Sequence, residues 1–176
     1  RPETHIKDYS FATELSDDFS SADFKARIWL RNSSEHKSGK LNLEMILKGK
    51  NSRGEKVTKR LTAPVKNLPS SSVECYSLSF VLENPELWSA EKPSLYDIEI
   101  RLYDGKQVVE ELYSHWGIWK CEIEGNTFKF NGKPVKLKGV NRHEHHPRTG
   151  RLVDRETMEK DLKLMKQANI NMIRTS

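Results

Sequence analysis

Hydrophobic and polar residues alternate through most of the first two thirds of the chain. In residues 24–30 every second residue is apolar, and the same period returns in residues 41–47 and 95–102. This period is typical of strands with one face buried and the other in water. The candidate strands are residues 24–30, 41–47, 56–65, 73–82, 95–102 and 108–113. About seven short strands at this spacing predict an immunoglobulin-like, antiparallel β-sandwich up to about residue 121.

After Trp119 the pattern changes to that of a strand–helix–strand unit. Asn131-Gly132 predicts a β-hairpin, Asp154 is a candidate helix N-cap, and Asn169 is a candidate helix stop. Residues 170–174 resemble a second strand. Between the caps, apolar residues recur at helical spacing, so we expect this face to pack inward: Met158, Leu162, Met165 and Ala168. The two strands of such a β-α-β unit should be parallel.

Residues 139–147 are the most distinctive stretch, because they contain His143-Glu144-His145-His146. We expect them to form a loop just past a strand over the alternating residues 134–138. The carboxyl ends of strands are where active sites lie in barrels of β-α-β units. A metal site is disfavoured, because the run does not match the helical His-Glu-x-x-His pattern. Two interpretations stay open: histidines that fix the loop by donating to backbone carbonyls, and a histidine that binds hydroxyl groups in a polar pocket.

Composition and charge disfavour a nucleic-acid-binding protein and a membrane-spanning protein. The net charge is +5, but no basic run is interleaved with aromatic residues, so nucleic acid is not an expected partner. No segment is apolar enough to span a membrane. Cys75 and Cys121 lack metal-ligand spacing and are expected to be free, partly buried thiols. Trp29 and Trp88 are candidates for a sugar-binding platform or for packing at a domain rim. The chain begins with Arg1, and we expect it to be a piece of a longer protein.

The C-terminal motifs closely resemble the start of the catalytic barrel in family 2 glycoside hydrolases. The matching segments are Asn131-Gly132-Lys133-Pro134, Gly139 to Pro147, Met165-Lys166-Gln167 and Asn171 to Ser176. The form Arg-His-Glu-His-His-Pro resembles the β-galactosidase branch, since the β-glucuronidase branch usually lacks the His-His-Pro. Residues 83–91 and Leu95-Tyr96 are similar to the sandwich domain that precedes that barrel. Gly117-Ile118-Trp119 stands where the family usually has Gly-Phe-Arg.

The resemblance implies a mostly β chain with two domains. Residues 1–121 would form the immunoglobulin-like β-sandwich, and residues 122–176 the N-terminal portion of a truncated (β/α)8 barrel, with its first β-α-β unit. The whole protein would be a retaining β-galactosidase. β-Glucuronidase and β-mannosidase of the same family are alternatives, and a non-catalytic carbohydrate-binding or scaffold module is a third.

The resemblance also implies roles for individual residues. His143 would contact the hydroxyls of a β-galactoside, and Arg174 would lie beside the catalytic nucleophile and keep it ionised. The remaining motif residues are expected to support the site: Asn141, Arg142, Glu144, His145 and His146.

The remainder of the active site is expected outside this chain. In the family the nucleophile and the acid/base are two glutamates on later barrel strands, roughly 5 Å apart. We therefore expect the chain alone to be inactive, and neither Glu144 nor Glu156 takes those roles. We expect no cofactor here, whereas Mg²⁺ and Na⁺ would bind further along the whole enzyme. Its other domains, and further copies in a homo-oligomer, are expected partners, and its compartment is not readable.

Overall fold

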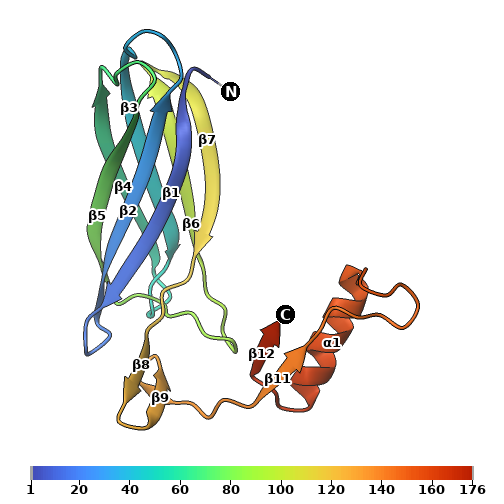
Figure 1. Ribbon diagram of the computed structural model, residues 1–176. Coiled ribbons are helices and arrows are strands. Elements are labelled where there is room, and N and C mark those ends of the chain that lie inside the picture. The colour runs from blue at the N-terminus through green and yellow to red at the C-terminus, as the bar shows by residue number, and fades with distance from the viewer. Residues whose placement is uncertain (1, 176) are drawn as a thin grey trace. The chain divides into compact units, whose positions relative to one another are not determined.

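The computed structural model describes residues 2–175, which form strands β1 to β12 and one helix (Figure 1). The chain divides into two compact units, the first ending at Cys121 and the second beginning at Glu122. The strands of the first unit are β1 (Thr4–Leu15), β2 (Ser21–Asn32), β3 (Lys40–Lys50), β4 (Lys56–Lys66), β5 (Val73–Glu83), β6 (Tyr96–Asp104) and β7 (Gln107–Trp116).

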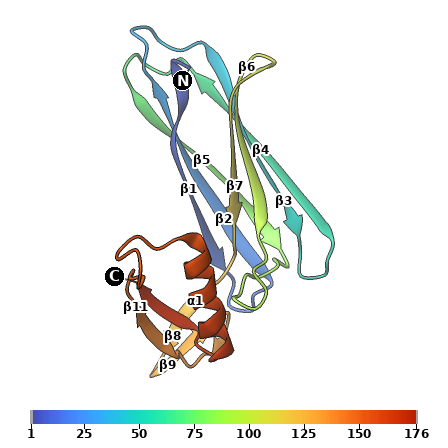
Figure 2. The same ribbon diagram turned by 90° about the vertical axis from the view of Figure 1, so that its right-hand side faces the viewer.

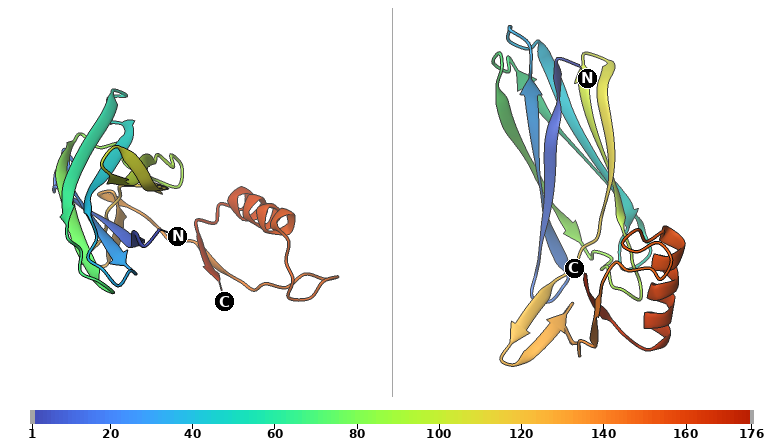
Figure 3. Two further views of the ribbon diagram at one scale, coloured as in Figure 1. Left: turned by 90° about the horizontal axis from the view of Figure 1, so that it is seen from above. Right: turned by 45° about the vertical axis from the view of Figure 1, so that its right-hand side comes forward.

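These strands form a two-layered antiparallel sandwich. One sheet has the order β1-β2-β5 and the other β4-β3-β6-β7. Figures 2 and 3 show the two layers from other sides. Strand β4 pairs with β3 and not with β5, so the order differs from the ABED and CFG sheets of antibody constant domains. The predicted sandwich is confirmed.

The core lies between the two sheets and follows the period of two. In β2 the inward residues are all buried, and so are those of β6: Phe24, Ala26, Ile28, Leu30, Tyr96, Ile98, Ile100 and Leu102. Phe24 stacks on Phe80 with ring centroids 5.0 Å apart. Each large aliphatic or Phe side chain of this set contributes about 1.5–3 kcal/mol when it is removed from water, which makes this core the main source of the unit's stability.

Strand β1 has no counterpart among the strands predicted from the sequence. A bulge between Ile6 and Asp8 shifts the register against β2. Ile6 is buried before the bulge, whereas Tyr9 and Phe11 pack on the core after it. The inward positions therefore change from even to odd residue numbers. This change of phase breaks the alternation that identified the other strands.

Asn32 ties two loops together at one end of the sandwich. Its side chain is fully buried, and Nδ2 donates to the carbonyls of His36, Leu68 and Pro69 at 2.7, 3.0 and 3.1 Å. Oδ1 accepts from the backbone N–H and the hydroxyl of Ser34 at 3.1 and 2.9 Å. A single side chain therefore satisfies polar groups of both the β2–β3 and the β4–β5 connections.

The two tryptophans do not form a shared platform. Strand β2 begins at Ser21, and Trp29 lies eight residues later. At about 3.3 Å per residue, Trp29 is about 26 Å from that end of the strand. Trp88 lies close to Gly117, and its backbone N–H donates to the carbonyl of Ile118 at 2.8 Å. Glu83 pairs with Ser21 in the ladder and precedes Trp88 in the chain. Trp88 therefore lies near the end of the sandwich where β2 begins, and Trp29 lies far from that end.

The cysteines are free, as predicted. Both Cys75 and Cys121 are exposed, so the expectation of partly buried thiols was wrong. Cys75 lies on the outward face of β5, where the period of two alternates it with inward residues such as Leu78. Within residues 2–175, no helix has the length and apolar character needed to cross a membrane.

The second unit contains two small sheets and the helix. Strand β8 (Cys121–Glu124) begins at the last residue of the first unit and continues into the second. The other elements are β9 (Thr127–Phe130), β10 (Lys133–Pro134), β11 (Gly139–Arg142), α1 (Arg155–Gln167) and β12 (Met172–Thr175). Strands β9 and β10 form the predicted hairpin, with Asn131 and Gly132 at φ 48° and 73°. Positive φ at both positions is what a type I′ turn requires.

Residues 139–142 correct one prediction. They were expected in a loop, but they form β11, which pairs in parallel with β12. The strand was instead expected over the alternating residues before Gly139, and residues 135–138 have no regular structure. The position of β11 in the sequence is set by its pairing with β12, a distant segment of the chain. The predicted parallel β-α-β arrangement is confirmed. Ser176, the last residue of the matching segment Asn171 to Ser176, lies outside the described residues.

Helix α1 begins and ends where the sequence predicts. The Oδ1 atom of Asp154 accepts the N–H of Thr157 at 2.8 Å, and this bonding lowers the pKa of the Asp154 carboxyl. Asn169 adopts a positive φ of 59° just after the helix. The expectation of an inward-packed face is not met by the described residues: Met158 and Met165 are half-buried, and Leu162 is 51% exposed.

Candidate active-site pocket

A small pocket lies at the carboxyl ends of β11 and β12. The register of the two parallel strands places Asn141 beside Arg174 and Arg142 beside Thr175. The pocket has a volume of about 110 Å³ and is lined by Asn141, Arg142, His143, Arg174 and Thr175. Four of the residues predicted from the sequence therefore meet at one point, although Arg174 lies 31 residues after His143.

Asn171 holds the two strands in register. Its Oδ1 accepts the N–H of Lys138 at 2.7 Å, its Nδ2 donates to the carbonyl of Lys136 at 3.0 Å, and its own N–H donates to the carbonyl of Lys138 at 3.1 Å. These bonds hold the residues just before β11 next to the residue just before β12. The sequence placed Asn171 in the second strand and in the matching segment Asn171 to Ser176, but gave it no supporting role; its position directly before β12 was the available signal.

Arg142 joins β11 to the helix. Its Nε donates to Oδ2 of Asp161 at 3.0 Å, and its side chain is only 11% exposed. Asp161 was not predicted as a site residue. It interrupts the apolar face of α1 next to Leu162, and a carboxylate in such a stripe indicates a buried cationic partner.

We expect Arg142 and Asp161 to stabilise each other. Because the pair is partly shielded from water, a double-mutant cycle of Arg142→Ala and Asp161→Ala should give a coupling free energy of about 1 kcal/mol. The exposed pair Arg155 and Glu159 on the same helix, at 2.8 Å, is the control and should give about 0.3 kcal/mol. Equal coupling in both cycles, measured by chemical unfolding of the second unit, would contradict the anchoring role of Arg142.

The three histidines occupy different environments. His143 lines the pocket and meets His145 edge-on, with ring centroids 6.4 Å apart. His146 closes a turn with Gly150 through two backbone hydrogen bonds of 2.7 and 3.0 Å. Its Nδ1 faces the N–H groups of Arg148 and Thr149 at 3.3 and 3.2 Å. The ring therefore accepts from the backbone, whereas the sequence suggested donation to carbonyls.

The pocket contains no carboxylate among its lining residues. Glu144 is exposed and lies outside the lining, and Glu156 is in the first turn of α1. Within residues 2–175 no three His, Cys, Asp or Glu side chains are placed to hold a metal ion together. The residues present therefore do not fit a magnesium site, and no chemical step is assigned to a metal here.

Comparison with known proteins gives consistent matches over both units. The model for glycosyl hydrolases family 2 matches residues 4–118, and the family 2 TIM barrel domain model matches residues 121–176. A beta-galactosidase of Yersinia enterocolitica is 34% identical over 188 residues, which cover 100% of this chain and 17% of that protein. The chain thus spans about a sixth of that relative's length.

Solved structures show the same fold. A putative beta-galactosidase from Bacteroides fragilis has a TM-score of 0.84 at 24% identity, covering 99% of this chain and 26% of its own. A β-glucuronidase from Ruminococcus gnavus in complex with D-glucaro 1,5-lactone has a TM-score of 0.71 at 29% identity, with the same coverage of 99% and 26%.

Proposed function

Because the chain belongs to glycosyl hydrolase family 2, we propose that it is part of a longer retaining hydrolase that cleaves terminal β-D-galactosides. The observation that carries the proposal is the shared pocket of His143 and Arg174 at the ends of two parallel strands. Functional groups in barrels of β-α-β units converge at this position.

The two side chains suit different parts of a glycoside reaction. An imidazole both donates and accepts, so His143 can bind sugar hydroxyls in either direction. The guanidinium of Arg174 is a cation and favours the ionised form of a neighbouring carboxylate. In a retaining mechanism that carboxylate attacks the anomeric carbon, while a second carboxylic acid protonates the leaving oxygen. We assign neither role to a residue of this chain.

The proposal is tested by comparing this chain with the longer polypeptide that contains it. We expect the chain alone to give no turnover of a chromogenic β-galactoside, because its pocket offers no carboxylate pair. The longer polypeptide should hydrolyse the same substrate with retention at the anomeric carbon. Turnover by the chain alone would overturn the assignment of the glutamates to later strands. An inactive longer polypeptide would favour a non-catalytic module.

The sugar is the second point to test. β-Glucuronidases are among the structural relatives, whereas the beta-galactosidase of Yersinia enterocolitica is the more similar of the two in sequence, at 34% identity against 29%. The residues His145, His146 and Pro147 favour the galactosidase reading, because they complete the form typical of that branch. A panel of β-galactoside, β-glucuronide and β-mannoside substrates on the longer polypeptide should give the highest kcat/KM for the galactoside. A higher value for the glucuronide would reverse the assignment.

A further inference from the structure

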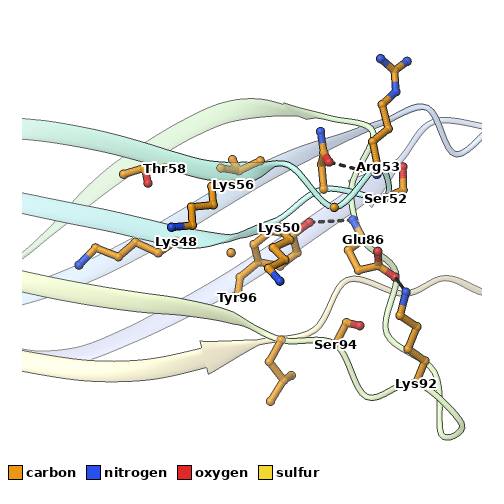
Figure 4. A pocket seen from close by; sticks show the side chains of 15 residues that line it. Lys48, Lys50, Ser52, Arg53, Lys56, Thr58, Glu86, Lys92, Ser94 and Tyr96 are labelled. Carbon is orange, nitrogen blue, oxygen red and sulfur yellow. Dashed lines mark hydrogen bonds and ion pairs between the residues drawn. The ribbon is translucent and has the colours of Figure 1, made fainter.

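The sandwich unit carries a large cleft lined by cationic side chains (Figure 4). The cleft has a volume of about 880 Å³ and lies between the β3–β4 hairpin and the loop that precedes β6. Five cations contribute to its lining, which we call the basic cleft: Lys48, Lys50, Arg53, Lys56 and Lys92. Glu86 is the one carboxylate among the lining residues.

The carboxylates near the basic cleft are already engaged. Glu86 pairs with Lys92 at 2.6 Å, and Glu99 pairs with Lys48. Glu55, which follows the hairpin turn, accepts a hydrogen bond from Nδ2 of Asn51 at 2.7 Å. Among residues 2–175, no carboxylate lies within 4.0 Å of the cationic groups of Lys50, Arg53 or Lys56, so these three charges have no counter-ion within that range.

Two of these cations face each other across the ladder. Lys50 and Lys56 are direct partners of β3 and β4, so their side chains project from the same face of the sheet. Like charges at directly opposite positions destabilise a sheet. Lys48 lies on the same face about 7 Å further along β3. An anion bound between these side chains would relieve the repulsion.

The backbone that carries the cations is held firmly. Oδ1 of Asn51 accepts the backbone N–H groups of Arg53 and Glu55 at 3.0 and 2.9 Å, which fixes the hairpin turn. The buried hydroxyl of Tyr96 accepts the N–H of Glu86 at 2.7 Å and so fixes the loop before β6. Gly49 has no room for a side chain, because an added Cβ would lie 2.4 Å from the Tyr96 ring. The cleft is therefore pre-formed.

We propose that the basic cleft binds an anionic saccharide, a chain whose sugars bear carboxylate or sulfate groups. Ammonium groups are compact charges that accept either anion in many orientations. The hydroxyls of Ser52, Thr58 and Ser94 also line the cleft and can bond sugar hydroxyls. Tyr96 is 1% exposed and offers no face for stacking, which disfavours single-stranded nucleic acid. The choice of a saccharide rests on the proposed glycosidase function.

The test uses this chain and calorimetric titration with heparin oligosaccharides and oligogalacturonates. At low salt we expect binding of at least one of the two, and the double variant Lys50→Ala/Lys56→Ala should weaken it about tenfold. The control variant Lys37→Ala/Lys106→Ala removes the same charge at exposed positions of the sandwich outside the cleft and should leave the affinity within about twofold. The melting temperature of the first variant should not fall, because a like-charge pair is removed.

Each other outcome overturns the proposal. Absence of binding to both saccharides, or equal weakening by the two double variants, would show that the cleft is an ordinary solvated surface. Binding of poly-L-glutamate as tight as that of the saccharides would assign the cleft to an acidic peptide. Binding is measured without catalysis, so a failed hydrolysis assay on the longer polypeptide would count against the proposed function and not against the cleft.

Discussion

Replacement of Asn32 by leucine is expected to destabilise the sandwich by about 3–5 kcal/mol, a large fraction of the stability of a domain of this size. Leucine has a similar volume but cannot bond to the carbonyls of His36, Leu68 and Pro69, which Nδ2 reaches at 2.7 to 3.1 Å. Each carbonyl left buried without a donor costs about 1–3 kcal/mol, and those nearest the surface recover part of this from water.

Urea unfolding followed by circular dichroism measures the effect. The matched control is Asn42→Leu, because Asn42 is an exposed residue of β3 and its replacement should change the free energy of unfolding by less than about 0.5 kcal/mol. Asn32→Asp should also destabilise the fold, since it retains the acceptor for Ser34 but places a carboxylate among three carbonyls. Equal effects of Asn32→Leu and Asn42→Leu would contradict the role of Asn32.

The predictable part of the fold is the part governed by a local period. In β2 and β6 every second residue contacts the opposite sheet, so apolar residues such as Phe24 and Ile98 reveal the strand without knowledge of its partner. Helix α1 could be predicted because its apolar residues recur at helical spacing and because Asp154 and Asn169 mark its ends. The strands and the helix named here are therefore specified by residues close together in the sequence.

The parts that were wrong or absent depend on distant contacts. The bulge near Lys7 exchanges the faces of β1, and only the register against β2 reveals it. Strand β11 was placed too early, because Val135 and Leu137 alternate like strand residues while the pairing partner of β11 lies more than thirty residues away. Asn32 has no local signature, since its partners come from two separate loops.

The candidate site was predictable in its residues but not in its supports. His143 follows β11 and Arg174 lies near the end of β12, both belong to recognisable motifs, and the structure brings both to one pocket. Asp161 and Asn171 are polar residues of common types, and their contacts to Arg142 and to residues 136–138 appear only in three dimensions. The five cations of the basic cleft are likewise dispersed in the sequence between residues 48 and 92.

Within the proposed hydrolase, Arg174→Ala is expected to lower kcat/KM by about 10²-fold, since electrostatic groups aimed at a reacting centre contribute on this scale. The effect should depend on pH. A cation beside a carboxylate lowers the pKa of that carboxylate by about 1–3 units, so its removal raises the pKa. A nucleophile must be ionised to attack, so as the pH falls the variant should lose activity at a higher pH than the unchanged enzyme does. The acidic limb of the pH–rate profile should move upward by at least about one unit.

The control is Arg151→Ala, because Arg151 is an exposed arginine of the same unit that does not line the pocket. It should leave kcat/KM and both limbs of the profile unchanged. Arg174→Lys separates charge from shape: if Arg174 acts through its charge on the nucleophile, lysine should restore the acidic limb while kcat/KM recovers only in part, since lysine lacks the planar fork of donors. A loss of activity in Arg174→Ala with an unmoved acidic limb would instead assign Arg174 to positioning of the sugar, because a residue that only orients substrate leaves the ionisation of the nucleophile untouched.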